Sequence, residues 1–205
     1  MRRIVVVLFL LLTTGTVAAA AAEPNPEAVL ERLRRQTADV ATLASDFVQE
    51  KHLAVFQEVL TSKGRFYFQR PNRLRWELTE PVATGFVLDG DQGRRWHART
   101  GQSEDFNLDR EPVMKLVAEQ LLAWAGGDFS RLRQQFRIAI VSEQPAVLRL
   151  EPLAAAGGFL DHLRVAFAGD GRHVQSVEVH EIDGDFTRIR FSAARVNAPL
   201  PADAF

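Results

Sequence analysis

The sequence predicts an α+β fold, mainly antiparallel β-sheet, curled into an unclosed barrel of about ten to eleven strands with a helical lid. Short stretches of alternating apolar and polar residues follow one another with short turns between them, as in consecutive antiparallel strands. Helical periodicity interrupts this pattern near the start and in the middle of the chain. A sheet of this length must curl, and amphipathic helices are the available cover for its apolar face.

Residues 1–22 have the features of a secretory signal peptide. Met1-Arg2-Arg3 is basic, residues 4–12 form an apolar run too short to span a bilayer, and residues 18–22 are small residues that offer cleavage sites. A retained membrane anchor is the alternative. We therefore predict export to the periplasm and a single domain over residues 23–205.

Composition excludes several classes of protein. The 205 residues include no cysteine, which excludes disulfides, thiol catalysis, thiolate metal sites and lipid attachment to an N-terminal cysteine. The formal net charge of −1 gives no reason to expect nucleic-acid binding.

The first predicted helix covers residues 26–43. Asn25 can cap it, Pro26 suits the first helical position, and Glu27 favours the positive end of the helix dipole. Its apolar residues at helical spacing are Val29, Leu30, Leu33, Val40 and Leu43. Strands are predicted next at residues 45–51 and 54–61.

Residues 64–77 form the most regular predicted hairpin. Each of its two strands has one apolar face. These faces consist of Phe66 and Phe68 in the first strand, and of Leu74, Trp76 and Leu78 in the second. Pro71 at the bend holds Arg70 extended at the end of the hairpin.

The remaining elements follow with clear turn signals. Asp89-Gly90 is a hairpin turn, and Gly126-Gly127 ends a helix. Strands are predicted at residues 84–88, 94–98, 104–108, 136–141, 146–151, 160–167, 174–180 and 187–192. Helices are predicted at residues 112–124 and 129–134, and the tail at 197–205 is predicted to be extended.

No catalytic or cofactor-binding motif is present, and neither a cofactor nor a metal is predicted. His180-Glu181-Ile182-Asp183 could hold a metal in principle. On a strand, however, His180 points to one face while Glu181 and Asp183 point to the other, so we interpret the segment as a solvated strand end. The sequence therefore gives no support for an enzyme.

The apolar side chains of the strands and of the central helix are the candidate ligand-binding residues. For any one of them ordinary core packing is the alternative. Together they suit a lidded apolar cavity for a hydrophobic ligand. The candidates are Phe66, Phe68, Leu74, Trp76, Phe86, Leu88, Trp96, Leu116, Leu121 and Trp124. Arg70 has five donors that could meet backbone carbonyls of the lid, and is the candidate lid latch.

Several motifs resemble the LolA family of periplasmic lipoprotein carriers. They are Phe47-x-Gln49-x-Lys51, Gly64-x-Phe66-x-Phe68-x-Arg70-Pro71-x-x-x-x-Trp76, Leu88-Asp89-Gly90, Thr187-x-Ile189-x-Phe191 and the ending Leu200-Pro201 to Phe205. The missing cysteine distinguishes the chain from the related LolB receptors, which are anchored through a lipidated N-terminal cysteine.

This resemblance implies a monomeric carrier that holds lipoprotein acyl chains beneath helical lids. It would take cargo from an inner-membrane LolCDE-type transporter and deliver it to a LolB-type receptor at the outer membrane. The family's gating arginine corresponds to Arg70, and an apolar residue near the cavity mouth corresponds to Leu74. The tail stops at Phe205, without the extension of some relatives. The resemblance therefore leaves open a LolA-like carrier of another lipid, such as a glycolipid or a polyene lipid. A periplasmic enzyme or a sensor module on the same fold is a further alternative.

Overall fold

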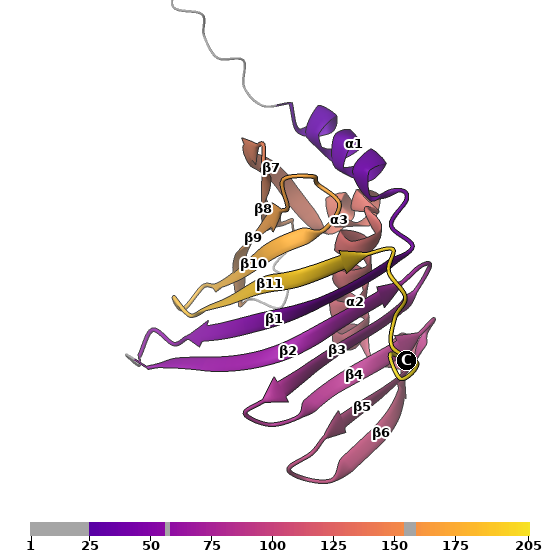
Figure 1. Cartoon of the computed structure of the whole chain (residues 1–205). Helices are drawn as coiled ribbons and strands as arrows, with labels where there is room; N and C mark the ends of the chain where they lie inside the picture. The colour runs from indigo at the N-terminus through magenta and orange to yellow at the C-terminus, as the bar shows by residue number, and fades with distance from the viewer. Residues whose placement is uncertain (1–24, 56–57, 154–158) are drawn as a thin grey trace, which may run out of the picture.

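The computed structural model describes residues 25–55, 58–153 and 159–205 (Figure 1). The predicted signal peptide at residues 1–22 lies outside these described residues. The helices are α1 (Pro26–Thr37), α2 (Pro112–Gly126) and α3 (Phe129–Gln135), with a 3-10 turn at Leu108–Arg110. The strands are β1 (Thr42–His52), β2 (Val59–Gln69), β3 (Arg73–Glu80), β4 (Thr84–Asp89), β5 (Gln92–His97), β6 (Gln102–Asn107), β7 (Phe136–Glu143), β8 (Ala146–Pro152), β9 (Leu160–Phe167), β10 (Val174–Glu181) and β11 (Phe186–Val196).

All of these strands belong to one antiparallel sheet. Its order is β6-β5-β4-β3-β2-β1-β11-β10-β9-β8-β7, so β1 and β11 join two meandering halves. The edge strands β6 and β7 do not pair with each other, and the barrel is therefore unclosed. The predicted fold class and strand number are confirmed.

Local capping explains where α1 and α3 begin. The Asn25 side chain accepts a hydrogen bond from the Glu27 N–H at 3.0 Å, and Asp128 accepts one from the Ser130 N–H at 3.2 Å. These bonds satisfy amides that have no partner within the helix. The Asn25 cap was expected from the sequence.

The first helix ends at Thr37, so the prediction that it continues to Leu43 is wrong. Val40 and Leu43 do follow the helical period, but the chain pairs with two neighbours from Thr42 onward. Thr42 lies opposite Gln69 of β2, and Leu43 lies opposite Val196 of β11. Sheet pairing on both sides therefore overrides the local pattern.

The prediction of separate strands at 54–61 and from Gly64 is also wrong, because β2 begins at Val59 and continues through Gly64 to Gln69. Residue 64 is a glycine because the Phe47 ring packs directly over this position of the strand and leaves no room for a side chain. A Cβ atom at Gly64 would lie 2.3 Å from Cζ of Phe47. Glycine in a strand interior often marks such a close approach rather than a break.

The two faces of the sheet are covered differently. In Figure 1, α2 and α3 lie behind the sheet and the C-terminal tail crosses in front of it. We call the face covered by α2 the inner face and the opposite face the outer face. On the outer face, Leu200, Ala204 and Phe205 of the tail pack with Ala44 and Tyr67.

The inner face carries two hydrophobic clusters. One joins α1 and α3 to the half of the sheet that contains β7 to β10, with Leu33, Leu132 and Phe167 fully buried. The other joins α2 to the half that contains β1 to β6. No helix within the described residues is long and apolar enough to cross a membrane.

Candidate functional site

The inner face of β2 to β6 is arranged in rows of side chains that run across the strands. The innermost row consists of Phe68, Leu74, Leu88 and Phe106, whose neighbours in this row are fixed by the strand register. These side chains are at most 6 % exposed. They form the deepest apolar surface beneath α2.

The next row is aromatic and less covered. Phe66 lies opposite Trp76, and Trp76 lies opposite Phe86. Phe47 stacks on Trp76 with 4.2 Å between ring centroids, and Phe191 meets Trp76 edge-on at 6.1 Å. Offset and edge-to-face contacts of this kind stabilise aromatic clusters beyond the burial of area alone.

Helix α2 fills the space above these rows. Its Ala118 and Ala125 are buried against them, and Leu121 and Leu122 pack on the same cluster. The gap left between α2 and the centre of the sheet is only about 20 Å³. The centre of the apolar inner face is thus covered by the protein's own helix, and a ligand that occupied this centre would have to displace α2.

Arg70 fastens the C-terminal end of α2. Its Nε donates to the Val40 carbonyl at 3.0 Å, and its Nη2 donates to the carbonyls of Thr37 and Gly126, each at 3.0 Å. One guanidinium thus bridges the end of β2, the segment between α1 and β1, and the last residue of α2. This is the geometry that a latch would need.

The segments that Arg70 joins are closely packed. Gly127 follows α2 with a positive φ of 75°, and a Cβ atom there would lie 1.8 Å from Oγ1 of Thr37. Thr37 is fully buried, and its hydroxyl donates to the Leu33 carbonyl at 2.9 Å. The chain after α2 therefore requires glycine for both backbone and space.

The N-terminal end of α2 lies beside a groove of about 370 Å³. Trp76, Leu78, Phe86 and Met114 supply its apolar walls. Polar side chains reach the same groove from β5 and β6.

Arg95 is the central charge of this groove. It forms salt bridges with Glu104 at 2.9 Å and with Glu111 at 2.7 Å. Hydrogen bonds to Glu104 and Glu111 raise the pKa of the Arg95 guanidinium. Glu104 lies opposite Arg95 in the sheet, whereas Glu111 is the residue that begins α2.

The structure brings most of the sequence-predicted residues together on the inner face. Phe66, Phe68, Leu74, Trp76, Phe86, Leu88 and Leu121 all belong to, or pack against, the cluster beneath α2. Trp124 is buried in the cluster around α1 and α3, and its Nε1 has no hydrogen-bond partner among the described residues. Leu116 is half-buried and belongs to neither cluster.

Trp96 does not join this group. It lies opposite Gly85 in the sheet, and Gly85 lies opposite Glu77, which places all three residues on the outer face. The Arg75 guanidinium sits 4.7 Å from the Trp96 ring, a cation–π contact on that face. The inward residues on either side of it in β5 are Arg95 and His97.

Two aromatic side chains of the site were not among the sequence-predicted residues. Phe47 is 1 % exposed and stacks on Trp76, and Phe191 touches Phe47, Phe66 and Trp76. The alternation Leu43-x-Ser45-x-Phe47 carried the signal for Phe47. Phe191 meets the others because β11 pairs with β1, a pairing between the two ends of the chain.

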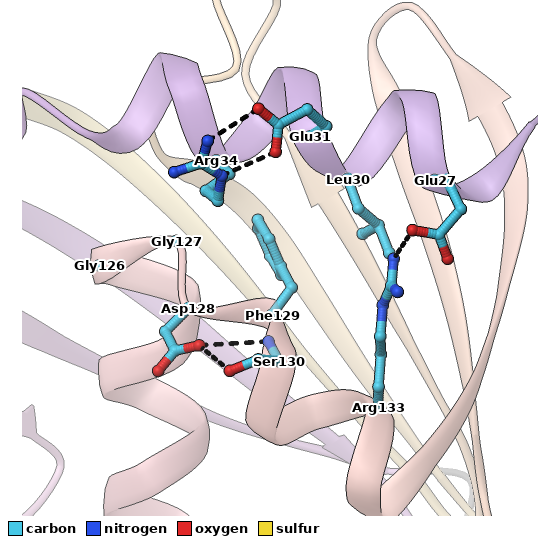
Figure 2. A pocket seen from close by; sticks show the side chains of 10 residues that line it. All are labelled: Glu27, Leu30, Glu31, Arg34, Gly126, Gly127, Asp128, Phe129, Ser130 and Arg133. Atoms are coloured by element: carbon cyan, nitrogen blue, oxygen red, sulfur yellow. Dashed lines mark hydrogen bonds and ion pairs between the residues drawn. The ribbon is translucent and has the colours of Figure 1, made fainter.

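A different pocket lies between α1 and the turn that joins α2 to α3 (Figure 2). Its volume is about 570 Å³, and Phe129 points into it from α3. Its charges are paired, with Arg133 on Glu27 at 2.7 Å and Arg34 on Glu31 at 2.7 Å. The hydrogen bond from Arg34 lowers the pKa of Glu31. The pocket therefore combines paired charges with the apolar side chains of Leu30 and Phe129, and differs in chemistry from the inner face.

Titratable groups do not gather into a reactive centre in the part of the chain that the structure describes. No group of three or more histidine or carboxylate side chains there could hold a metal ion. The ring stack of His162 on His180, with centroids 4.3 Å apart, lies on the outer face beside salt-bridged side chains. The arrangement that the sequence and the fold share is the lidded apolar face.

Comparison with known proteins identifies the family of the chain. The family model described as "Outer membrane lipoprotein carrier protein LolA" matches residues 38–205. An outer-membrane lipoprotein carrier protein of Leptothrix cholodnii is 27% identical over 180 residues, covering 82% of this chain and 81% of that protein. One of Methylococcus capsulatus is 26% identical over 189 residues, covering 90% and 84%.

Among solved structures, a LolA superfamily protein from Nitrosomonas europaea matches with a TM-score of 0.41 and 8% identity, covering 85% of this chain and 94% of that one. The family model spans the whole sheet, α2 and α3, including the rows of the inner face and Arg70. The chain therefore belongs to the LolA family of outer-membrane lipoprotein carrier proteins.

Proposed function

We propose that this protein is a periplasmic carrier that shelters the acyl chains of lipoproteins between α2 and the inner face of the sheet. The observation that carries the proposal is an apolar, aromatic face covered by a helix that Arg70 fastens through backbone carbonyls. The names of the family and of its curated members support the class of cargo.

The closed state suits a carrier because α2 covers the apolar inner face when no cargo is bound. An acyl chain of about 15 methylenes gains roughly 12 kcal/mol gross on leaving water, at about 0.8 kcal/mol for each CH₂. Part of this gain is cancelled, since α2 must leave its own contacts with the face before the chain can enter. Cargo can therefore be bound and also released.

Loading and unloading would depend on partners. The proposed route takes cargo from an inner-membrane LolCDE-type transporter and delivers it to a LolB-type receptor at the outer membrane. The carrier would act as a monomer and without catalysis, and the predicted signal peptide at residues 1–22 would direct it to the periplasm. Arg70 would act as the lid latch in this cycle, and Leu74 as part of the acyl-chain surface.

A transfer assay tests the proposal. The full-length protein is incubated with liposomes that contain a fluorescent diacylated lipopeptide, and soluble complex is separated from the liposomes by flotation. We expect the wild-type protein to keep lipopeptide in solution. The Trp76→Glu variant should keep less than half as much lipopeptide in solution as the wild type. Val59→Glu, which places the same charge on an exposed side chain on the outer face of β2, is the matched control and should behave like wild type. Failure of the wild-type protein to solubilise the lipopeptide would contradict the proposal.

A further inference from the structure

Helix α2 is held very differently at its two ends. The C-terminal end carries the buried residues Ala123, Trp124 and Ala125 and is bonded to Arg70, and Ala118 is buried at the middle of the helix. The N-terminal half exposes apolar side chains instead.

Val113 is 75% exposed and Val117 is 41% exposed. Apolar burial is the main term that keeps a helix on a sheet, so the N-terminal half is the less firmly held. The groove beside Trp76 and Phe86 opens directly under this half, at Met114.

An ion pair ties the N-terminal end of α2 to the sheet. Arg95 of β5 donates to the carboxylate of Glu111, the first residue of the α2 region, at 2.7 Å. The Glu111 side chain makes no capping hydrogen bond to the helix, and its carboxylate is directed to Arg95 of the sheet instead.

The pair is built to open at low cost. Arg95 also donates to Glu104, its neighbour across β5 and β6, through Nε and Nη2. When Glu111 moves away, Arg95 therefore keeps a carboxylate partner and no unpaired charge is left on the inner face. Both partners of the Arg95–Glu111 pair are partly exposed, at 39% and 28%, so water can replace the contact.

We propose that Arg95 and Glu111 form a gate, that α2 opens first at its N-terminal end while the Arg70 latch still holds its C-terminal end, and that an acyl chain enters along the groove of Trp76, Leu78 and Phe86. The route of the acyl chain rests on the proposed carrier function. The gate itself is a property of the fold and can be tested without lipid.

Hydrogen–deuterium exchange on the full-length protein provides this test. In Glu111→Gln, exchange of the amides of residues 115–118 should rise about two- to five-fold, the factor expected for a partly exposed ion pair. Amides of residues 123–127 should not change. Glu104→Gln is the matched control, because it removes the other carboxylate of Arg95 and leaves the tie to Glu111 in place. It should leave residues 115–118 at wild-type exchange.

The salt dependence of hydrogen exchange provides a second test, because only a contact between charges is weakened by salt. Raising NaCl from about 0.05 M to about 0.5 M screens the ion pair and should speed exchange at residues 115–118 in the wild type. The same change should have no such effect in Glu111→Gln, where the ion pair is absent. It should also spare the end fastened by Arg70, whose acceptors are neutral carbonyls.

The outcomes separate the gate from the carrier function. Unchanged exchange in Glu111→Gln, or equal loosening in Glu104→Gln, overturns the gate whether or not the protein takes up lipid. Faster exchange in Glu111→Gln alone supports the gate. With the gate supported, Glu111→Gln should also load the fluorescent lipopeptide about two- to five-fold faster than wild type. An unchanged loading rate overturns the proposed route, and a wild-type protein that loads no lipopeptide overturns the carrier function.

Discussion

Replacing Arg70 with leucine tests how the lid is held. The substitution removes three hydrogen bonds from one guanidinium to the carbonyls of Val40, Thr37 and Gly126. Hydrogen bonds from charged donors are worth about 1.5–3 kcal/mol each when they are desolvated. Arg70 is an exposed residue, and a value of about 1 kcal/mol for each bond is more suitable.

The expected loss is therefore about 2–3 kcal/mol in the free energy of unfolding. In a domain of this size it corresponds to a fall of about 4–12 °C in Tm. The variant should still fold, because Arg70 belongs to neither hydrophobic cluster of the inner face and both clusters are left unchanged. Urea and thermal unfolding followed by circular dichroism measure the change, and Arg65→Leu, at an exposed position of the same strand, is the control.

Hydrogen exchange then locates the effect. Amides at residues 38–41 and 124–127 should exchange faster in Arg70→Leu, because both segments lose their tie to β2. Residues in the centre of β1 and β2 should change only through the global loss of stability. If Arg70→Leu melts like the wild type and exchange at both segments is unaltered, the latch geometry does not hold the lid.

Three further substitutions probe the packing and the titration of the fold. Phe68→Ala should lower the unfolding free energy by about 3–5 kcal/mol in urea titrations, since this ring is 1 % exposed beneath α2; a loss below about 1 kcal/mol would mean that the row is not close-packed. Gly127→Ala should cost clearly more than Gly101→Ala, because both have positive φ but only Gly127 meets the Thr37 hydroxyl; equal Tm values would argue against this close approach. Burial lowers the pKa of His173 below its ordinary value of 6.5, so protonation favours the unfolded chain and stability falls as pH drops below 6.5. His173→Gln should flatten this part of the stability profile between pH values of about 7.5 and 5, and an unchanged slope would contradict the assignment.

The fold was predictable because its signals are local. Asn25, Pro26 and Asp128 mark helix starts, and alternation marks the hairpin that contains Phe66 and Trp76. The first helix was predicted too long because the apolar spacing at Val40 continues past the point where pairing with two strands takes over.

The site was predictable only in part because its contacts are not local. The acceptors of Arg70 come from the α1–β1 segment and from α2, which local spacing cannot bring together. In β5, Arg95 points to the inner face and Trp96 to the outer face. From their polarity alone, the apolar Trp96 would be expected on the inner face and the charged Arg95 on the outer face. Arg95 is accommodated there because Glu104 and Glu111 surround it, and Glu111 lies sixteen residues along the chain.

We propose that acyl chains of lipoproteins occupy the space between α2 and the inner face. Native mass spectrometry of the full-length protein, expressed with its own leader and purified from the periplasm, tests this claim most directly. We predict a bound species whose mass corresponds to an acylated lipoprotein, lost in Trp76→Glu and retained in Val59→Glu. Recovery of the protein without lipid, or with a phospholipid or glycolipid in its place, would contradict the account.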